Sequence, residues 1–222
     1  MSVGKSSNFG NPNIGLYAKV SEKLVLADAS SSPKLILALS VFGLPVHAIS
    51  LGGSDLCGLF IAMNSNGVVL PKYCGRRDVA FFKGQGLNVA FLDSRFSAVG
   101  NNIAANDFGA VLNPEISNSE EKKISECLGV EAVRMGIAGH VTTGSCAVAT
   151  NKGFIAHNRA TSEELKELKS IFRSDGENCT MNAGIPFVSL GAVANSHNAL
   201  FGEACTGFEI GRAYSCLVPD GK

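Results

Sequence analysis

One stretch decides the fold of this chain: Gly100-Asn101-Asn102-Ile103-Ala104-Ala105-Asn106-Asp107-Phe108-Gly109-Ala110-Val111-Leu112-Asn113-Pro114. It predicts two short strands joined by a tight turn over residues 106–109, because Asn and Asp tolerate left-handed backbone and Gly adopts it without steric cost. Mostly small or apolar residues flank the turn, and Pro114 prevents the second strand from continuing. The stretch is therefore a β-hairpin, and its importance is that the chain repeats it.

The hairpin pattern occurs five times at an almost constant spacing. The turns close at residues 24, 67, 109, 153 and 198, which are 43, 42, 44 and 45 residues apart, so the units account for nearly all 222 residues. A fixed period of about 20 to 50 residues is typical of solenoids and propellers. The other copies are marked by Gly15, Ser21 and Leu24, by Gly58, Asn64, Gly67 and Pro71, by Gly144, Thr150 and Gly153, and by Asn195 and Asn198.

The first, third and fourth hairpins are each followed by a predicted helix and a third strand. Helix starts are marked by Pro33, by the capping box of Ser117 with Glu120, and by Thr161 with Glu164. We therefore expect strands near Ile14–Val20, Leu24–Ala27, Val46–Ser50, Asn88–Leu92 and Val130–Met135, and helices over Pro33–Phe42, after Ser117, after Thr161 and over Thr206–Leu217. In the second unit, Gly75, Gly84 and Gly86 interrupt the helix position, so a short or irregular turn is predicted for Lys72–Gly86.

The last unit lacks a closing strand after its helix. The spacing of the other units places a short strand at Val3–Ser7, and we infer that this strand joins the last unit and closes a ring. A closed ring of strand-strand-helix-strand units is a five-bladed α/β propeller. We expect a single domain over residues 1–222, with repeats at about 13–55, 56–97, 98–141, 142–187 and 188–217.

Composition narrows the functional classes. With 45% hydrophobic and 17% charged residues, the chain can bury a sizeable core and carries too little charge for disorder. It contains no apolar stretch long enough to span a membrane. The formal net charge is zero, so no global attraction to phosphate is expected. The seven cysteines form no C-x-x-C pair, which favours small buried side chains in a reducing compartment over a metal site or a disulfide framework.

Several short motifs, in their order and spacing, give the chain a resemblance to a known family. They are Ala98-Val99-Gly100-Asn101, Ala105-Asn106-Asp107-Phe108-Gly109, Thr150-Asn151-Lys152-Gly153 and Asn182-Ala183-Gly184. Together with the five units, they resemble translation initiation factor 6, a family of ribosome anti-association factors with the pentein fold. The resemblance extends from about Phe9 to Leu217, nearly the whole chain.

The resemblance implies a protein without chemistry of its own: no catalytic residue, cofactor, metal or small-molecule substrate, and no membrane. Family members bind the large ribosomal subunit, mainly through large-subunit ribosomal protein fourteen near the sarcin-ricin loop. They block association with the small subunit and take part in late large-subunit biogenesis. We accordingly expect a monomer in the cytoplasm, and also in the nucleolus or nucleus if the source is eukaryotic.

In the family, the ribosome-facing surface surrounds the fivefold axis, just after the leading glycines. Asn101 is the strongest candidate contact and Ser145 the second, although Asn101 could equally cap a local turn. The glycines themselves have a structural alternative, because each could allow close backbone approach near the axis. Leu59 departs from the charged residue of eukaryotic members, which puts that contact in doubt. The matching segments are Gly15-Leu16, Gly58-Leu59, Gly100-Asn101, Gly144-Ser145 and Gly191-Ala192.

The second unit holds the one locally basic stretch. Its side chains fit a solvated face, and also a contact to an anion or to ribosomal RNA. The residues are Lys72, Arg76, Arg77 and Lys83.

Two other functions remain open from the sequence. The pentein fold also houses guanidine-modifying enzymes that use a central Cys with His and carboxylates, and such a site would require these groups to converge in the central channel. Cys146 is the thiol nearest to the axial segments, and the four histidines fall at different points of their repeats. The other alternative is a protein-interaction propeller with no ribosomal role.

Overall fold

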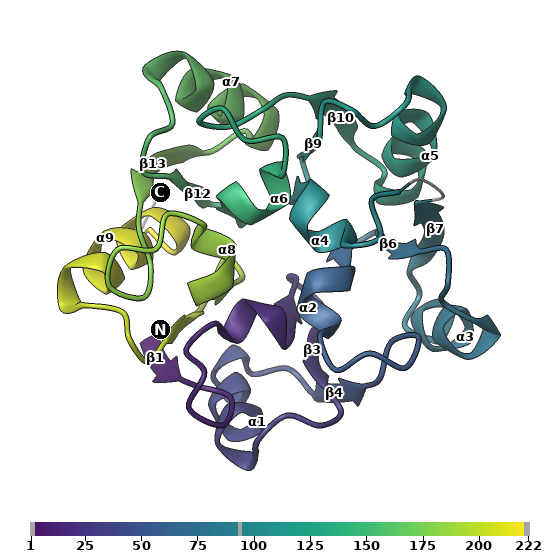
Figure 1. Ribbon diagram of the computed structural model, residues 1–222, viewed down its shortest axis with the longest axis horizontal. Helices are drawn as coiled ribbons and strands as arrows, with labels where there is room; N and C mark the ends of the chain where they lie inside the picture. Colours follow the sequence, from purple (N-terminus) through teal and green to yellow (C-terminus); the bar gives the residue numbers. More distant parts are fainter. Residues whose placement is uncertain (1–2, 93–94, 220–222) are drawn as a thin grey trace.

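The computed structural model describes residues 3–92 and 95–219, and its five three-stranded sheets surround a central axis (Figure 1). The predicted five-bladed α/β propeller is confirmed. In chain order the blades contain β2 (Ala18–Val20), β3 (Val25–Asp28) and β4 (Val46–Ile49); β5 (Ala62–Met63), β6 (Gly67–Pro71) and β7 (Asn88–Leu92); β8 (Ile103–Ala105), β9 (Gly109–Leu112) and β10 (Glu131–Arg134); β11 (Ala147–Ala149), β12 (Gly153–His157) and β13 (Asp175–Cys179); and β14 (Ala192–Ala194), β15 (Ala199–Gly202) and β1 (Val3–Ser6).

Each blade is an antiparallel hairpin extended by one parallel strand. In the deciding stretch, Ala104 pairs with Val111, and the Asn106 carboxamide oxygen accepts the N–H groups of Phe108 and Gly109, which closes the turn. A longer helix lies at the rim of every blade (Figure 1). These helices are α1 (Pro33–Leu39), continued by the 3-10 turn η2 (Ser40–Phe42), α3 (Arg76–Gly84), α5 (Asn118–Leu128), α7 (Ser162–Phe172) and α9 (Gly207–Leu217).

The N-terminal strand completes the last blade. β1 pairs in parallel with β15, with Val3 opposite Ala199 and Ser6 opposite Gly202. The Lys5 ammonium donates to the Cys205 carbonyl at 2.8 Å. The two ends of the array are therefore joined by a full strand pairing.

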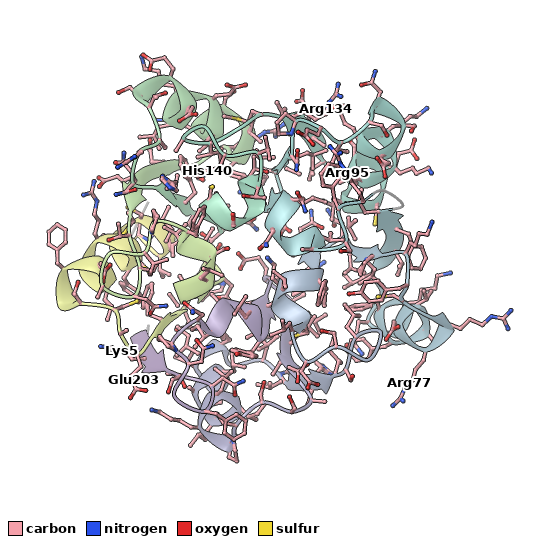
Figure 2. The ribbon with its side chains drawn as sticks, viewed as in Figure 1. Lys5, Arg77, Arg95, Arg134, His140 and Glu203 are labelled. Atoms are coloured by element: carbon pink, nitrogen blue, oxygen red, sulfur yellow. The ribbon has the colours of Figure 1, made fainter. Side chains whose placement is uncertain are left out.

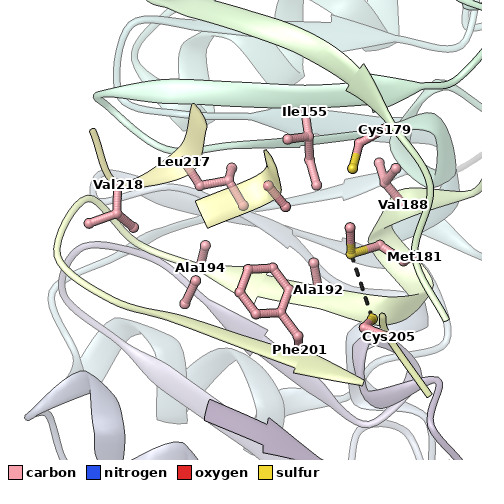
Figure 3. Close-up of a cluster of buried hydrophobic side chains, with 12 residues drawn as sticks. Ile155, Cys179, Met181, Val188, Ala192, Ala194, Phe201, Cys205, Leu217 and Val218 are labelled. Carbon is pink, nitrogen blue, oxygen red and sulfur yellow. Dashed lines mark hydrogen bonds between the residues drawn. The ribbon is translucent and has the colours of Figure 1, made fainter. Parts of the chain in front are cut away.

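No blade has a core of its own. Each buried cluster combines one blade with the sheet of the preceding blade: Ile155 of β12 packs with Phe201 and Leu217 of the last blade (Figure 3). The cycle closes, because Val193 and Leu200 of the last blade pack into the core of the first. A blade removed from the ring would expose apolar surface on both sides, so the ring is expected to fold as a unit.

The structure corrects the expectation for Lys72–Gly86. The sequence predicts a short or irregular turn there, but α3 forms over Arg76–Gly84. The Asp78 carboxylate accepts the Gly75 N–H at 2.8 Å, which caps the helix start, and Phe82 is fully buried. Helix propensity alone underestimates the stability of a helix in this segment, because tertiary packing of Phe82 outweighs the destabilising effect of the glycines.

The strand expected over Ile14–Val20 is also shorter than predicted. Residues Ile14–Leu16 form a 3-10 turn, η1, and only Ala18–Val20 are strand. The first strand of each hairpin is the inner strand of its blade. One helical turn precedes this inner strand in every other blade as well. These turns are α2 (Cys57–Phe60), α4 (Val99–Asn102), α6 (Thr143–Cys146) and α8 (Val188–Gly191).

The Glu209 carboxylate ties α9 to the loop that enters the last blade. It is only 4% exposed, and it accepts the N–H groups of Ala183, Gly184 and Thr206 together with the Thr180 hydroxyl. The same loop has left-handed backbone at Ala183, with φ of 61°. Burial alone would raise the pKa of Glu209, but these donors outweigh it and hold that pKa below its ordinary value of 4.5.

We expect Glu209→Gln to lower the free energy of unfolding at pH 7 by about 3 kcal/mol, because the new amide N–H₂ would face N–H donors. A lowered carboxyl pKa stabilises the fold above the ordinary value of 4.5, and this contribution is lost as the pH falls through the folded-state pKa. The deficit measured by urea denaturation should therefore shrink in acid. The exposed Glu167→Gln is the matched control. An equal effect of both variants, or a deficit independent of pH, would contradict this role.

Candidate interaction surface around the central axis

The short helical turns bring the leading glycines into contact around the axis. A Cβ on Gly58 would lie 2.1 Å from the Gly15 carbonyl oxygen, and one on Gly100 would lie 2.5 Å from that of Gly58. On Gly144 it would lie 2.3 Å from that of Gly100, and on Gly15 only 1.8 Å from the Ser189 oxygen. Each glycine therefore admits the backbone of the preceding blade, which favours the structural alternative for these residues.

The sequence interpretation places the fifth pair, Gly191-Ala192, two residues too late in the chain. In α2, α4 and α6 the leading glycine is the second residue of the turn, and in α8 that position is Ser189. Gly191 instead faces Met181, and Ala192 is 2% exposed within β14. The surface position matching Asn101 is therefore Leu190.

The residue directly after each leading position in the sequence is partly exposed at one end of the axis in four of the five blades. These residues are Leu16, Leu59, Asn101 and Leu190. The same four residues line the axial cavity, which has a volume of about 50 Å³. These four side chains are three apolar groups and one amide, a composition that suits contact with a protein.

Asn101 has no turn-capping role. Within the described residues its side chain makes no hydrogen bond, whereas the neighbouring Asn102 donates to the Ala98 carbonyl at 2.8 Å and accepts from the Asn113 amide at 2.7 Å. The amide of Asn101 is therefore available to a partner.

Ser145 is different. Its hydroxyl donates to the Thr142 carbonyl at 2.6 Å and the residue is only 7% exposed, so it stabilises α6 from within. Asn101 and Ser145 both lie in the short helical turns around the axis. Of these two candidates, only Asn101 has a side chain without a hydrogen bond to the described residues.

The other end of the inner strands carries a closed belt of hydrogen bonds. Ser196 donates to Glu22, the Asn151 N–H to Ser196, the Asp107 N–H to Asn151, and the Ser65 hydroxyl to Asp107. The circle is completed by the Lys23 ammonium, which donates to the Ser65 carbonyl at 3.2 Å. Because these polar groups bind one another, they stabilise the ring, and the end with Asn101 is the better candidate for a partner.

Comparison with known proteins now identifies the family. The model of the eIF-6 family matches residues 3–215. The chain belongs to the eIF-6 family. Similar proteins include "Translation initiation factor 6" of Saccharolobus islandicus strain L.S.2.15, 35% identical over 98% of this chain and 99% of the relative, and that of Staphylothermus marinus, 35% identical over 95% of each. A third, from Thermococcus onnurineus, is 33% identical over 95% of each chain.

The basic stretch of this eIF-6 family member lies at the rim, away from the axis. Arg76, Arg77 and Lys83 are exposed on α3, and Figure 2 shows Arg77 on the outer side of that helix. Lys72 is exposed in the turn before it. The stretch therefore forms a separate patch and not an extension of the axial surface.

The alternative of a central Cys–His site finds little support in the geometry. Of the cavity-lining residues, all of them described, none is Cys, His, Asp or Glu. Cys57 and Cys146 lie behind the lining with no exposed surface, and burial raises the pKa of both thiols, that of Cys146 to about 11. Both thiols are therefore protonated and poor nucleophiles at neutral pH.

Two histidines pack together away from the axis in this eIF-6 family member. The rings of His140 and His157 are 5.0 Å apart beside Phe187, and the His157 Nδ1 accepts the Arg159 N–H. Burial, followed by the charges of His140 and Arg159, lowers the pKa of His157. Over residues 3–92 and 95–219, no three His, Cys, Asp or Glu side chains form a group that could hold a metal ion.

None of the described helices is both long enough and apolar enough to cross a bilayer.

Proposed function

We propose that this protein binds the large ribosomal subunit and prevents premature association with the small subunit, with a further role in late large-subunit biogenesis. Membership of the eIF-6 family and the printed name of the relatives, "Translation initiation factor 6", support a role in translation. The observation that carries the proposal is the unpaired Asn101 amide, set among Leu16, Leu59 and Leu190 at one end of the axis.

The proposed partner on the subunit is a protein, large-subunit ribosomal protein fourteen, close to the sarcin-ricin loop. The chain has 19 basic and 19 acidic residues, so counterion release on binding RNA would give little affinity overall. A central apolar patch with one amide fits a protein surface better. The ring closes on itself and leaves no exposed end repeat, which favours action as a monomer. We place that action in the cytoplasm.

The rim patch on α3 is proposed as a secondary contact to ribosomal RNA. We expect Arg76→Glu with Arg77→Glu to weaken large-subunit binding several-fold and to reduce its salt dependence, because both guanidinium groups are exposed. Binding is measured at several salt concentrations. The control is Arg173→Glu, an exposed arginine of a different blade. Unchanged binding of the double variant at low salt would refute the RNA contact.

A subunit-joining experiment tests the proposed function. Large subunits are incubated with the protein, small subunits are added, and joined ribosomes are followed by light scattering. We expect joining to fall in proportion to the protein bound, and to recover when excess free large subunits are supplied. Normal joining at saturating protein would overturn the anti-association role.

A further inference from the structure

One amine faces the axial cavity. Lys19 is the middle residue of β2 and lies two residues before the turn residue Ser21. The equivalent positions of the other inner strands, two residues before Asn64, Asn106, Thr150 and Asn195, are Ala62, Ala104, Val148 and Val193. The first blade therefore places a lysine where every other blade has a small apolar side chain.

Lys19 is the single ionisable residue that lines this cavity of about 50 Å³, all of whose lining residues are described. Its ammonium has no hydrogen-bond acceptor or ion-pair partner in the described parts of the chain. Burial lowers the pKa of Lys19 to about 8, with a smaller opposing effect of Cys57. A cation in such a site is destabilising unless a counter-charge is supplied.

Asp28, the buried carboxylate of the same blade, makes no ion pair with Lys19 in the described parts of the chain. Asp28 is fully buried, and both its charge and that of Lys19 act on the Cys57 thiol. One Asp28 carboxylate oxygen accepts the N–H and the hydroxyl of Ser30 at 2.7 and 2.6 Å. The Cys57 thiol itself donates to the Tyr17 carbonyl at 3.0 Å.

Residues of the inner strands with unpaired backbone groups border the same cavity. The turn residues pair with the second strand of each hairpin; for example, the Asn106 N–H donates to Gly109 and the Asn195 N–H to Asn198. By antiparallel alternation, the preceding residue turns its N–H and C=O away from that strand. The inner strands form no sheet with one another, so these N–H and C=O groups lie on the free edge of each inner strand. The five residues concerned all line the cavity: Val20, Met63, Ala105, Ala149 and Ala194.

We infer that the axial cavity binds a small monovalent inorganic anion, held by the Lys19 ammonium and by backbone N–H groups of the inner strands. The volume of about 50 Å³ admits a few water molecules or one halide-sized ion. Such an ion would neutralise the amine and bridge strands of different blades, so it would stabilise the closed ring.

The experiment measures thermal unfolding with chloride, bromide or the bulky anion gluconate at matched ionic strength. We expect a rise of about 4 °C at a tenfold excess of halide over its dissociation constant, relative to gluconate. The rise should be absent in Lys19→Met and intact in Lys166→Met, an exposed lysine of α7. An equal halide response of all three proteins, or none in the wild type, would overturn the site.

Bromide crystallography provides a second arm that needs no variant. We expect an anomalous peak in the axial cavity within hydrogen-bonding distance of the Lys19 Nζ. A cavity that holds water alone in crystals grown with bromide would overturn the inference. Neither arm uses ribosomes, so the result is independent of the proposed function.

Discussion

Gly58→Ala is expected to destabilise the protein by about 3 kcal/mol and to lower the melting temperature by about 10 °C. The added Cβ would lie 2.1 Å from the Gly15 carbonyl oxygen and 2.5 Å from that of Ala18. Both oxygens belong to the backbone of the preceding blade, so relief of the overlap requires α2 to move away from η1. Because every blade completes the core of its neighbour, that separation weakens the whole ring.

Gly211→Ala is the matched control. Gly211 lies within α9, and a Cβ there would meet no atom within 4 Å. The same substitution should therefore raise the melting temperature by a few degrees, since alanine is favoured over glycine in a helix by about 1 kcal/mol. Thermal unfolding of both variants measures the difference. Equal melting temperatures would contradict the close packing of glycines around the axis.

Asn101→Arg is expected to weaken binding to the large ribosomal subunit by at least about 100-fold, a loss of nearly 3 kcal/mol. Its side chain is partly exposed and makes no hydrogen bond within the described residues, so the fold should tolerate the change. An arginine at the centre of a mainly apolar contact would be desolvated without a partner. Affinity for purified large subunits is the measured quantity, with the melting temperature as a check on folding.

His197→Arg separates the two ends of the axis. His197 is exposed at the hairpin turn of the last blade, at the end that carries the hydrogen-bonded belt. This variant adds a comparable positive charge to the opposite end, and its binding should stay within about twofold of the wild type. A larger loss for His197→Arg than for Asn101→Arg would place the binding surface at the end that carries the hydrogen-bonded belt. That result would contradict the assignment to the end with Asn101.

The hairpins could be predicted from sequence because their determinants are local. Asn106 closes its own turn through its carboxamide oxygen, and the same side chain then donates to the Thr150 and Phe172 carbonyls at 2.8 and 2.9 Å. The first interaction can be predicted from the turn sequence, because it joins residues that are close in the chain. The second links two blades and becomes visible only when the ring is assembled.

The features that the sequence interpretation missed depend on contacts between distant residues. The helix α3 forms in spite of its glycines because Phe82 is buried in the core shared with the first blade. The one-turn helices around the axis are too short for any periodicity to reveal.

The position of the fifth candidate pair, Gly191-Ala192, was predicted wrongly for another reason. A glycine marks this position in the other four blades, whereas Ser189 occupies it in the last. Ser189 precedes the turn residue Asn195 by six residues, as Gly100 precedes Asn106, so counting back from the turn would have found it. The division of the chain into repeats at the stated bounds stays a prediction, as does the role of each surface residue on the ribosome.

Co-sedimentation of the purified protein with separated ribosomal subunits tests the central claim most directly. Large and small subunits are each mixed with the protein, centrifuged through sucrose, and the pellets are analysed for bound protein. The account predicts close to one protein per large subunit, none on small subunits, and loss of the large-subunit signal with Asn101→Arg. Binding to neither subunit, or to the small subunit alone, would contradict it.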